Sequence, residues 1–233
     1  MRPHRPRYAP GVNTTVWMPD LNDFETVLGE DGISDLLEAL ADVSGVPGDL
    51  VECGSWRGGS AMILGEALRR QTDARIVYAC DSYEGFDLEE LRSEREAGRT
   101  GEPDDAFAST SVKYVEAKIR ARGLEGRVVP VKGYFAETLV TLDGPFAMAL
   151  IDCDLPASIL FAARTLWPRL SPGGLMLFDD YLNAERFSGA RVAVDEFRVE
   201  RRAEIDDERL QRRLYRVRRA AGTFEAGEPA TDR

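Results

Sequence analysis

The sequence predicts an α/β protein built on a doubly wound, mostly parallel sheet. Short apolar runs alternate along the chain with longer segments whose apolar residues follow helical spacing. The short runs are apolar throughout, which is typical of parallel strands that helices cover on both faces. The length of 233 residues fits one such domain.

The expected elements begin at a helix over residues 34–43, for which Ser34 is a suitable cap. Further helices are expected over residues 58–70, 109–122, 135–139, 157–170 and 188–201. Strands are expected over residues 50–53, 75–80, 127–131, 146–151, 175–178 and 214–217. Ser171-Pro172-Gly173-Gly174 is expected to be the turn that closes the helix over residues 157–170.

Two segments interrupt this alternation. Residues 82–108 are acidic, polar and dotted with Gly and Pro, which in a compact domain indicates a lid or binding loop. Residues 1–20 contain four prolines and no periodicity, so we expect an arm that orders only against another part of the structure. The chain is therefore divided into an N-terminal arm or lid (1–33), a main domain (34–221) and a flexible C-terminal tail (222–233).

Composition excludes several classes of partner. With 41 acidic and 30 basic residues the net charge is −11, and such a surface repels phosphate backbones and anionic lipid. No run approaches the ~20 apolar residues of a membrane span, and the first ten residues lack the apolar centre of a signal peptide. We therefore expect a cytoplasmic protein. Cys53, Cys80 and Cys153 are expected to be buried thiols.

A glycine-rich turn follows the first expected strand, with the sequence Glu52-Cys53-Gly54-Ser55-Trp56-Arg57-Gly58-Gly59-Ser60. Glycines let such a turn approach a ligand closely, and the next helix presents free N–H groups. A dinucleotide site would carry glycine where Trp56 stands, and the indole would obstruct a pyrophosphate. The acid Glu52 suits a ligand with an ammonium group, such as methionine, although an ordinary strand-to-helix turn is the alternative.

A second acid, Asp81, follows the second strand, 29 residues after Glu52. An acid at this place can accept hydrogen bonds from both hydroxyls of a ribose, although helix caps and turns also use aspartate. Together the two acids favour an adenosine-bearing ligand. The segment Lys132-Gly133-Tyr134-Phe135, after the third strand, is a candidate to flank the adenine.

Four carboxylates follow the next two strands: Asp152 and Asp154 after the fourth, Asp179 and Asp180 after the fifth. The carboxyl ends of parallel strands meet at one edge of the sheet, so these side chains should gather there. They would raise one another's pKa unless a cation neutralises them. Carboxylates without Cys or His select a hard ion, magnesium or calcium, over zinc. Helix capping is the alternative for any single member.

Four segments resemble the macrocin O-methyltransferase family, and the resemblance extends from about residue 34 to 200. They are residues 51–60, 81–86, 151–155 and 170–181. The resemblance implies a class I, Rossmann-like methyltransferase with seven strands, S-adenosylmethionine as methyl donor, and a sugar hydroxyl of an antibiotic as acceptor. After Asp-x-Asp-Leu the family usually continues Tyr-Glu-Ser-Thr, whereas this chain has Pro156-Ala157-Ser158.

The resemblance also implies residue roles. Asp152, Asp179 and Asp180 match the positions that hold Mg²⁺ in the family, and Asp154 matches a general base. The cofactor-binding positions that it implies, with the acids and the adenine-flanking segment described above, are Glu52, Gly54, Ser55, Gly58, Gly59, Ser60, Asp81, Ser82, Gly133, Tyr134, Phe135 and Asp152. Magnesium lowers the pKa of a bound hydroxyl, and a nearby carboxylate can take the proton.

The expected function is thus magnesium-dependent O-methylation of a hydroxyl, one of a vicinal diol, on a glycosylated natural product. Lys132 is a second candidate for the base, whereas His4, the sole histidine, lies in the arm. A catechol acceptor is an alternative. An NAD(P)-dependent oxidoreductase is disfavoured by Trp56 and by the lack of a Ser/Tyr/Lys or His catalytic set, and a non-catalytic module of the same fold is a further alternative. The expected partners are a small-molecule acceptor and further copies of the chain in a homo-oligomer.

Overall fold

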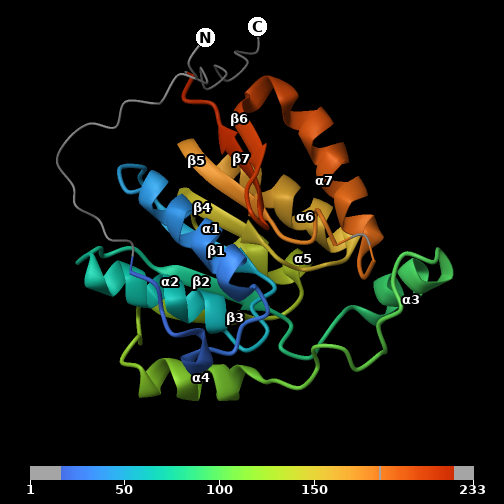
Figure 1. The fold of residues 1–233 in the computed structure, drawn as a ribbon, viewed down its shortest axis with the longest axis horizontal. Helices are drawn as coiled ribbons and strands as arrows, with labels where there is room; N and C mark the ends of the chain where they lie inside the picture. The colour runs from blue at the N-terminus through green and yellow to red at the C-terminus, as the bar shows by residue number, and fades with distance from the viewer. Residues whose placement is uncertain (1–16, 184, 223–233) are drawn as a thin grey trace, which may run out of the picture.

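The computed structural model describes residues 17–183 and 185–222, which form one sheet with helices on both faces (Figure 1). Its strands are β1 (Asp49–Cys53), β2 (Val77–Asp81), β3 (Val128–Lys132), β4 (Phe146–Ile151), β5 (Leu170–Phe178), β6 (Ile205–Leu210) and β7 (Tyr215–Arg219). Its α-helices are α1 (Gly29–Asp42), α2 (Gly59–Arg70), α3 (Leu88–Glu96), α4 (Val112–Ala121), α5 (Phe135–Thr138), α6 (Pro156–Leu166) and α7 (Ser188–Arg201). Residues 1–16 of the expected arm, with His4, and residues 223–233 of the expected tail lie outside the described residues.

The strand order is β3-β2-β1-β4-β5-β7-β6. The first five strands in this order pair in parallel, whereas β7 is antiparallel to both β5 and β6. The structure therefore confirms the expected mostly parallel, seven-stranded, doubly wound sheet. The chain winds outward from β1 to β3 and then returns to place β4 beside β1, so the order reverses between these two strands. Ligands of such sheets bind outside the carboxyl ends of the strands at this reversal.

Two hydrophobic cores cover the two faces of the sheet. The first packs α1, α2 and α4 against the strands, with Leu36, Met62 and Ile119 among its buried members. The second packs α6 and α7 on the opposite face, with Ile159 and Phe197 among its members. Within the described residues, no helix combines the length and the apolar character needed to cross a membrane.

The first helix begins at Gly29, five residues before the expected start. Ser34 lies inside α1, so its expected role as the cap is wrong. The residue before the helix is Leu28, which makes no side-chain capping bond but is buried in the core. Two glycines and two acids in the first four positions hide the helical pattern, and the acids favour this end through the helix dipole.

Three further elements differ from expectation. Ser171–Gly174 belongs to β5, which starts at Leu170, and does not form a separate turn. The strand β6 was not expected, because its sequence Ile-Asp-Asp-Glu-Arg-Leu is mostly charged, as edge strands often are. The segment 82–108 contains α3, which extends away from the sheet in Figure 1. Only Leu91 and Glu94 of this helix are buried, too few to give a readable periodicity.

Asp35 attaches the turn between β6 and β7 to α1. Its fully buried carboxylate accepts hydrogen bonds from the backbone N–H groups of Arg213 (2.8 Å) and Leu214 (3.0 Å). It also accepts one from the Arg212 side chain, at 2.8 Å. Since three donors converge on one buried acid, its loss would leave buried N–H groups without partners.

We predict that Asp35→Ala lowers the free energy of unfolding by about 3 kcal/mol, because it removes charge-assisted hydrogen bonds and strands their donors. Urea unfolding followed by circular dichroism measures the change. Glu116→Ala, at an exposed acid within α4, is the control and should alter stability by less than about 0.5 kcal/mol. Equal stability of the two variants would show that Asp35 does not hold the turn.

Candidate active site

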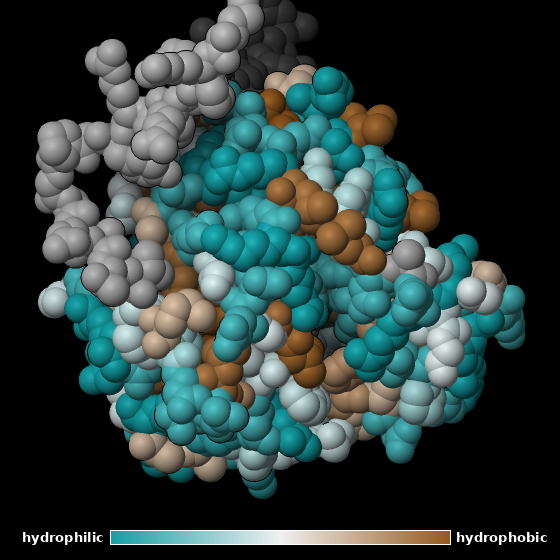
Figure 2. All heavy atoms as spheres, in the orientation of Figure 1, coloured by the Kyte–Doolittle hydropathy of each residue, from teal (hydrophilic) through white to brown (hydrophobic). Residues whose placement is uncertain are grey.

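A cavity of about 510 Å³ opens at the carboxyl ends of the parallel strands. The face of the molecule in Figure 2 is mostly hydrophilic, with a few hydrophobic side chains around its recessed centre. Ten of the residues expected to serve the site line the cavity: Gly54, Asp81, Ser82, Gly133, Tyr134, Phe135, Asp152, Asp154, Asp179 and Asp180. Residues separated by up to 126 positions in the sequence therefore meet in one place.

Asp81 joins the glycine-rich turn to the start of the 82–108 segment. Its carboxylate accepts the backbone N–H of Trp56 at 2.7 Å and that of Tyr83 at 2.5 Å. Both donors have left-handed backbones, with φ of 47° and 54°, a conformation that costs energy for residues other than glycine. Burial raises the pKa of Asp81, and these N–H donors act against that rise. Asp81 thus organises two turns and also faces the cavity.

Glu52 lies behind the cavity and does not line it. The side chain is fully buried and accepts hydrogen bonds from the hydroxyls of Ser55 (3.0 Å) and Ser60. Burial raises its pKa to about 7. In this structure Glu52 therefore holds the turn together from within. Ser55, Gly58, Gly59 and Ser60 are also absent from the cavity lining.

Close backbone contacts explain two glycines of this turn. A Cβ atom on Gly54 would lie 1.7 Å from the carbonyl oxygen of Asp152, where β1 and β4 end side by side. A Cβ atom on Gly59 would lie 2.2 Å from the carbonyl oxygen of Glu25. Gly54 thus allows the two strand ends to meet at the cavity, whereas Gly59 makes room for the N-terminal segment.

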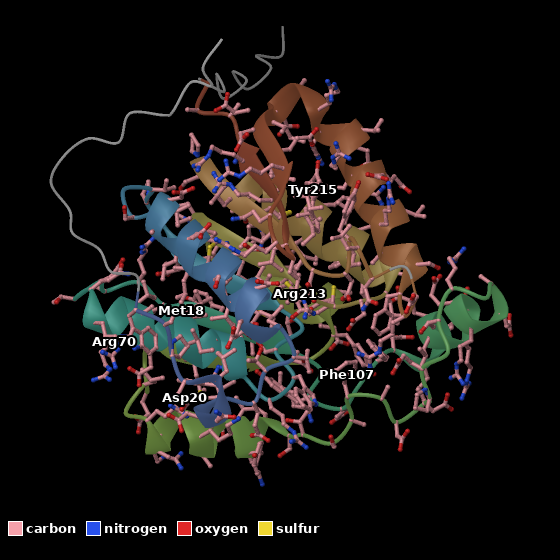
Figure 3. The ribbon with its side chains drawn as sticks, in the orientation of Figure 1. Met18, Asp20, Arg70, Phe107, Arg213 and Tyr215 are labelled. Atoms are coloured by element: carbon pink, nitrogen blue, oxygen red, sulfur yellow. The ribbon has the colours of Figure 1, made fainter. Side chains whose placement is uncertain are left out.

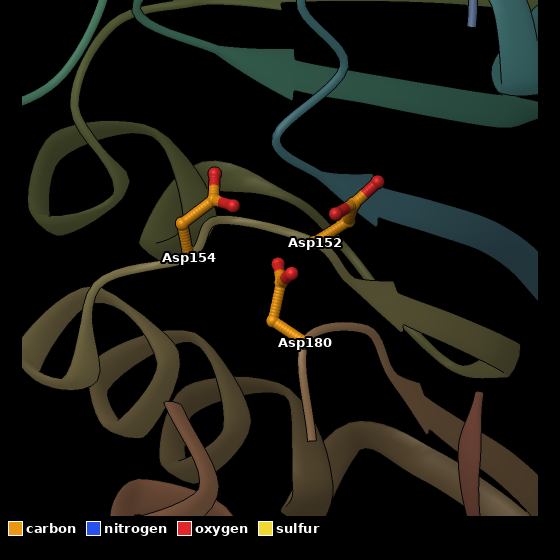
Figure 4. Close-up of side chains that lie close together, drawn as sticks. All are labelled: Asp152, Asp154 and Asp180. Carbon is orange, nitrogen blue, oxygen red and sulfur yellow. The ribbon is translucent and has the colours of Figure 1, made fainter. Parts of the chain in front are cut away.

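Three aspartates converge at the ends of β4 and β5 (Figure 4). Carboxylate oxygens of Asp152, Asp154 and Asp180 all lie within 4.8 Å of one another. Burial raises the pKa of Asp152 and of Asp154 well above the usual value, and the neighbouring aspartates raise both further. Asp154 and Asp180 also have left-handed backbones, with φ of 62° and 57°. Crowded oxygen donors of this kind suit a hard divalent cation.

Asp179 lies beside this trio but has a different partner. Arg213 donates to both of its carboxylate oxygens, from Nε at 2.7 Å and from Nη2 at 2.5 Å. The remaining Nη1 donates to the carbonyl oxygens of Val27 and Leu28, at 2.8 and 3.1 Å. The cluster therefore contains Asp154 where Asp179 was expected. Figure 3 places Arg213 between α1 and the strands.

Sequence reasoning missed Arg213, Arg186 and Glu90, all of which line the cavity. None lies in a recognisable motif, and each acts through a partner distant in the sequence. Arg186 pairs with Glu102 at 2.6 Å, and its guanidinium lies 5.2 Å from the ring centre of Phe107. Arg213, Arg186 and Glu90 therefore carry no local signal that would have identified them.

Lys132, the second candidate for the base, does not line the cavity, and its amine pairs with Glu84. Burial, together with neighbouring ionisable groups, raises the pKa of Cys53, Cys80 and Cys153. All three cysteines are buried free thiols, as expected.

A model of the family described as macrocin-O-methyltransferase (TylF) matches residues 16–212, most of the chain. The chain belongs to this family. The family resemblance found in the sequence is confirmed, and the fold agrees with it. Family membership also argues against the oxidoreductase alternative.

The chain is also similar to individual O-methyltransferases. The 8-demethyl-8-(2,3-dimethoxy-alpha-L-rhamnosyl)-tetracenomycin-C 4'-O-methyltransferase of Streptomyces olivaceus is 38% identical over 166 residues, 68% of this chain and 60% of the relative. The mycinamicin III 3''-O-methyltransferase of Micromonospora griseorubida is 31% identical over 202 residues, 82% of this chain and 72% of the relative. The solved structure of the O-methyltransferase NovP matches with a TM-score of 0.70 at 26% identity, covering 84% of this chain and 82% of that one. The chain thus matches 60% of the length of the first of these relatives.

The raised pKa of Glu52 predicts a pH dependence of stability. A carboxyl with a native pKa of about 7 stays protonated in the fold at a pH where the unfolded chain, with a value of 4.5, is ionised. Between these two pKa values the native state binds more protons than the unfolded chain. The contribution of Glu52 to the free energy of unfolding is therefore complete below pH 4.5 and is lost as the pH rises through 7. The difference between the native and unfolded pKa values corresponds to about 3 kcal/mol of stability.

We therefore predict that Glu52→Gln without ligand shows a smaller fall in the melting temperature than wild type between pH 5 and 8. Scanning calorimetry across this range measures both proteins, with Glu89→Gln, at an exposed acid, as the control. Parallel curves for wild type and Glu52→Gln would mean that Glu52 is ionised in the fold throughout.

Proposed function

We propose that this protein transfers a methyl group from S-adenosylmethionine to a hydroxyl on the sugar of a glycosylated natural product, with the help of Mg²⁺. The single observation that carries the proposal is the meeting of Asp81, Gly54 and the aspartate cluster in one cavity at the strand reversal. Membership of the macrocin O-methyltransferase family supports the reaction class. The rhamnosyl tetracenomycin enzyme, whose name specifies a sugar position, supports the acceptor class.

The residues divide between two halves of the cavity. Asp81, beyond β2, is the proposed partner of the ribose hydroxyls, and Gly133, Tyr134 and Phe135, beyond β3, are proposed to flank the adenine. Because Gly54 has no side chain, the ends of β1 and β4 can lie in contact between the two halves of the cavity. On the other side, the donor set of the aspartate cluster fits Mg²⁺, which when bound would lower the pKa of an acceptor hydroxyl. Asp152 and Asp180 are the proposed ligands. Asp179 is a third proposed ligand, and its binding to the metal would require its ion pair with Arg213 to open.

Asp154 is the proposed general base. In the reaction the acceptor oxygen takes the methyl group from the sulfonium, the sulfur keeps the electron pair of the broken bond, and the hydroxyl proton passes to Asp154. Burial and the neighbouring acids raise the pKa of Asp154, which makes its carboxylate a better proton acceptor, whereas Arg186 lowers it. Two vicinal hydroxyls of a sugar can approach such a cluster together, which favours a diol acceptor. Cytoplasmic location and a homo-oligomeric state stay predictions.

For the methyl donor, we predict that Asp81→Ala weakens binding of S-adenosylhomocysteine by about ten- to a hundredfold, the value of one or two hydrogen bonds to a charged group. Isothermal titration measures the dissociation constant. Glu89→Ala, at an exposed acid of α3, controls for general loss of charge, and circular dichroism verifies folding of both variants. Unchanged affinity in folded Asp81→Ala would remove this residue from the donor site.

For the metal and the base, turnover on a panel of rhamnosides and other glycosylated natural products, with catechol included, should disappear in excess chelator and return with Mg²⁺. Asp152→Asn and Asp180→Asn should both lose this metal-dependent turnover. In Asp180→Asn, which changes a residue outside the proposed donor site, the affinity for S-adenosylhomocysteine should change little. Asp154→Asn should still bind Mg²⁺ but turn over about 10²–10⁴-fold more slowly, the usual contribution of a general base.

Full turnover in excess chelator would contradict the metal assignment. Loss of Mg²⁺ binding in Asp154→Asn would make Asp154 a ligand, and the base would then have to be another group. Turnover on catechol alone would change the acceptor class without changing the chemistry.

A further inference from the structure

The turn that carries Asp154 leads directly into α6. Asp154 has a left-handed backbone, and Pro156 is the first residue of the helix two positions later. Within this turn the N–H of Leu155 bonds to the carbonyl oxygen of Cys153 at 2.6 Å. Such a conformation persists only where the surrounding contacts fix it. The position of the Asp154 carboxylate thus depends on how the start of α6 is held.

The start of α6 has no cap of its own. Leu155 occupies the capping position and has no side-chain oxygen to offer. Pro156 lacks an N–H group, and the N–H of Ile159 bonds to the carbonyl oxygen of Leu155 at 2.9 Å. The two N–H groups in between, on Ala157 and Ser158, have no partner within the helix.

Glu90, on α3, supplies the missing cap. One of its carboxylate oxygens accepts the N–H of Ala157 at 2.7 Å and that of Ser158 at 3.1 Å. The other accepts the hydroxyl of Ser158 at 2.6 Å. A negative side chain at this end of a helix is also favoured by the helix dipole.

The same face of α3 packs against the second core. Glu94, one turn after Glu90, is buried, and a Cβ on Gly189 of α7 would lie only 2.6 Å from its carboxylate. Leu91 belongs to the hydrophobic core that contains α6 and α7. A further contact attaches the 82–108 segment to the site. The guanidinium of Arg186, six residues after Asp180 in the sequence, donates to both carboxylate oxygens of Glu102.

We propose that Glu90 is a positioning residue: by capping α6 from the 82–108 segment, it holds the turn that carries Asp154, so that the carboxylate is aligned when α3 is docked. This rests on the proposed function, in which Asp154 removes the proton. The proposal thus gives the 82–108 segment a role in aligning the site in addition to lining the cavity.

The test compares four variants by two independent measurements. Glu90→Ala removes the cap, and Glu90→Gln keeps one oxygen acceptor. Glu89→Gln makes the same charge change at an exposed neighbour, and Glu102→Gln weakens another attachment of the segment, at Arg186, without removing a contact to α6. Hydrogen exchange by mass spectrometry follows peptides that span residues 153–158. Steady-state turnover uses whichever glycoside of the panel above is methylated.

We expect Glu90→Ala to increase exchange in residues 153–158 and to lower kcat about ten- to a hundredfold, the scale of a small misplacement of a reacting group. The dissociation constant of S-adenosylhomocysteine should change less than about twofold. Glu90→Gln should recover part of kcat because it still accepts a hydrogen bond. Glu89→Gln and Glu102→Gln should leave exchange in residues 153–158 as in wild type, and Glu89→Gln should also leave kcat unchanged.

Unchanged exchange in residues 153–158 of Glu90→Ala would overturn the proposal, since the cap would then hold nothing. An equal increase of exchange in residues 153–158 of Glu102→Gln would also overturn it, because docking of the segment alone would then explain the effect. Absence of turnover in wild type on every acceptor would instead contradict the proposed function. The exchange comparison would still decide whether Glu90 holds the turn.

Discussion

The crowding of four aspartates at the ends of β4 and β5, two of them buried and two half-buried, is the constraint on which the rest of the site depends. Burial removes water from these carboxylates, and their like charges repel one another. Each must therefore be protonated, paired with a basic group or bound to a cation. The structure meets this constraint unevenly. Asp179 is paired with Arg213, whereas Asp152, Asp154 and Asp180 face one another with raised pKa values for Asp152 and Asp154. Among the residues that the structure describes, these three aspartates form no ion pair, and they are the part of the cavity suited to a divalent cation.

Arg213 connects this charge arrangement to the framework of the fold. Its backbone N–H is held by Asp35 of α1, while its guanidinium binds Asp179 and two carbonyl oxygens that precede the same helix. The turn between β6 and β7, the start of α1 and the end of β5 are thereby joined through one side chain. The antiparallel edge of the sheet thus contributes a cation to a site that the parallel strands otherwise build.

The 82–108 segment meets the site from the opposite side. Its acids Glu90 and Glu102 reach α6 and Arg186, and Asp81 fixes its first turn. An edge-to-face series of rings, Trp56–Phe107, Phe107–Phe86 and Phe86–Phe187, runs along the same side. The segment is therefore held by polar contacts at several points and by a small number of buried apolar side chains.

The sequence by itself determined the parallel sheet, the glycine-rich turn and the placement of Asp81, Asp152, Asp154 and Asp180 at strand ends. Each of these follows from local pattern, because an apolar strand followed by polar residues must deliver those residues to one edge of the sheet. The family was also readable, since its motifs are contiguous in the chain. The charged strand β6 and the helix α3 could not be predicted from the sequence. Each buries too few apolar side chains to show the periodicity of a strand or a helix.

Only the tertiary structure decided how the acids divide their work. Glu52 faces inward to Ser55 and Ser60, Asp179 meets Arg213, and Glu90 caps a helix 67 positions away. These contacts depend on the direction in which each side chain points and on which distant element packs beside it. Neither is encoded in a local pattern, because the same acid type at a strand end or on an exposed helix is compatible with a ligand, a cap or an ion pair. Packing selects among them by placing a donor within hydrogen-bonding distance.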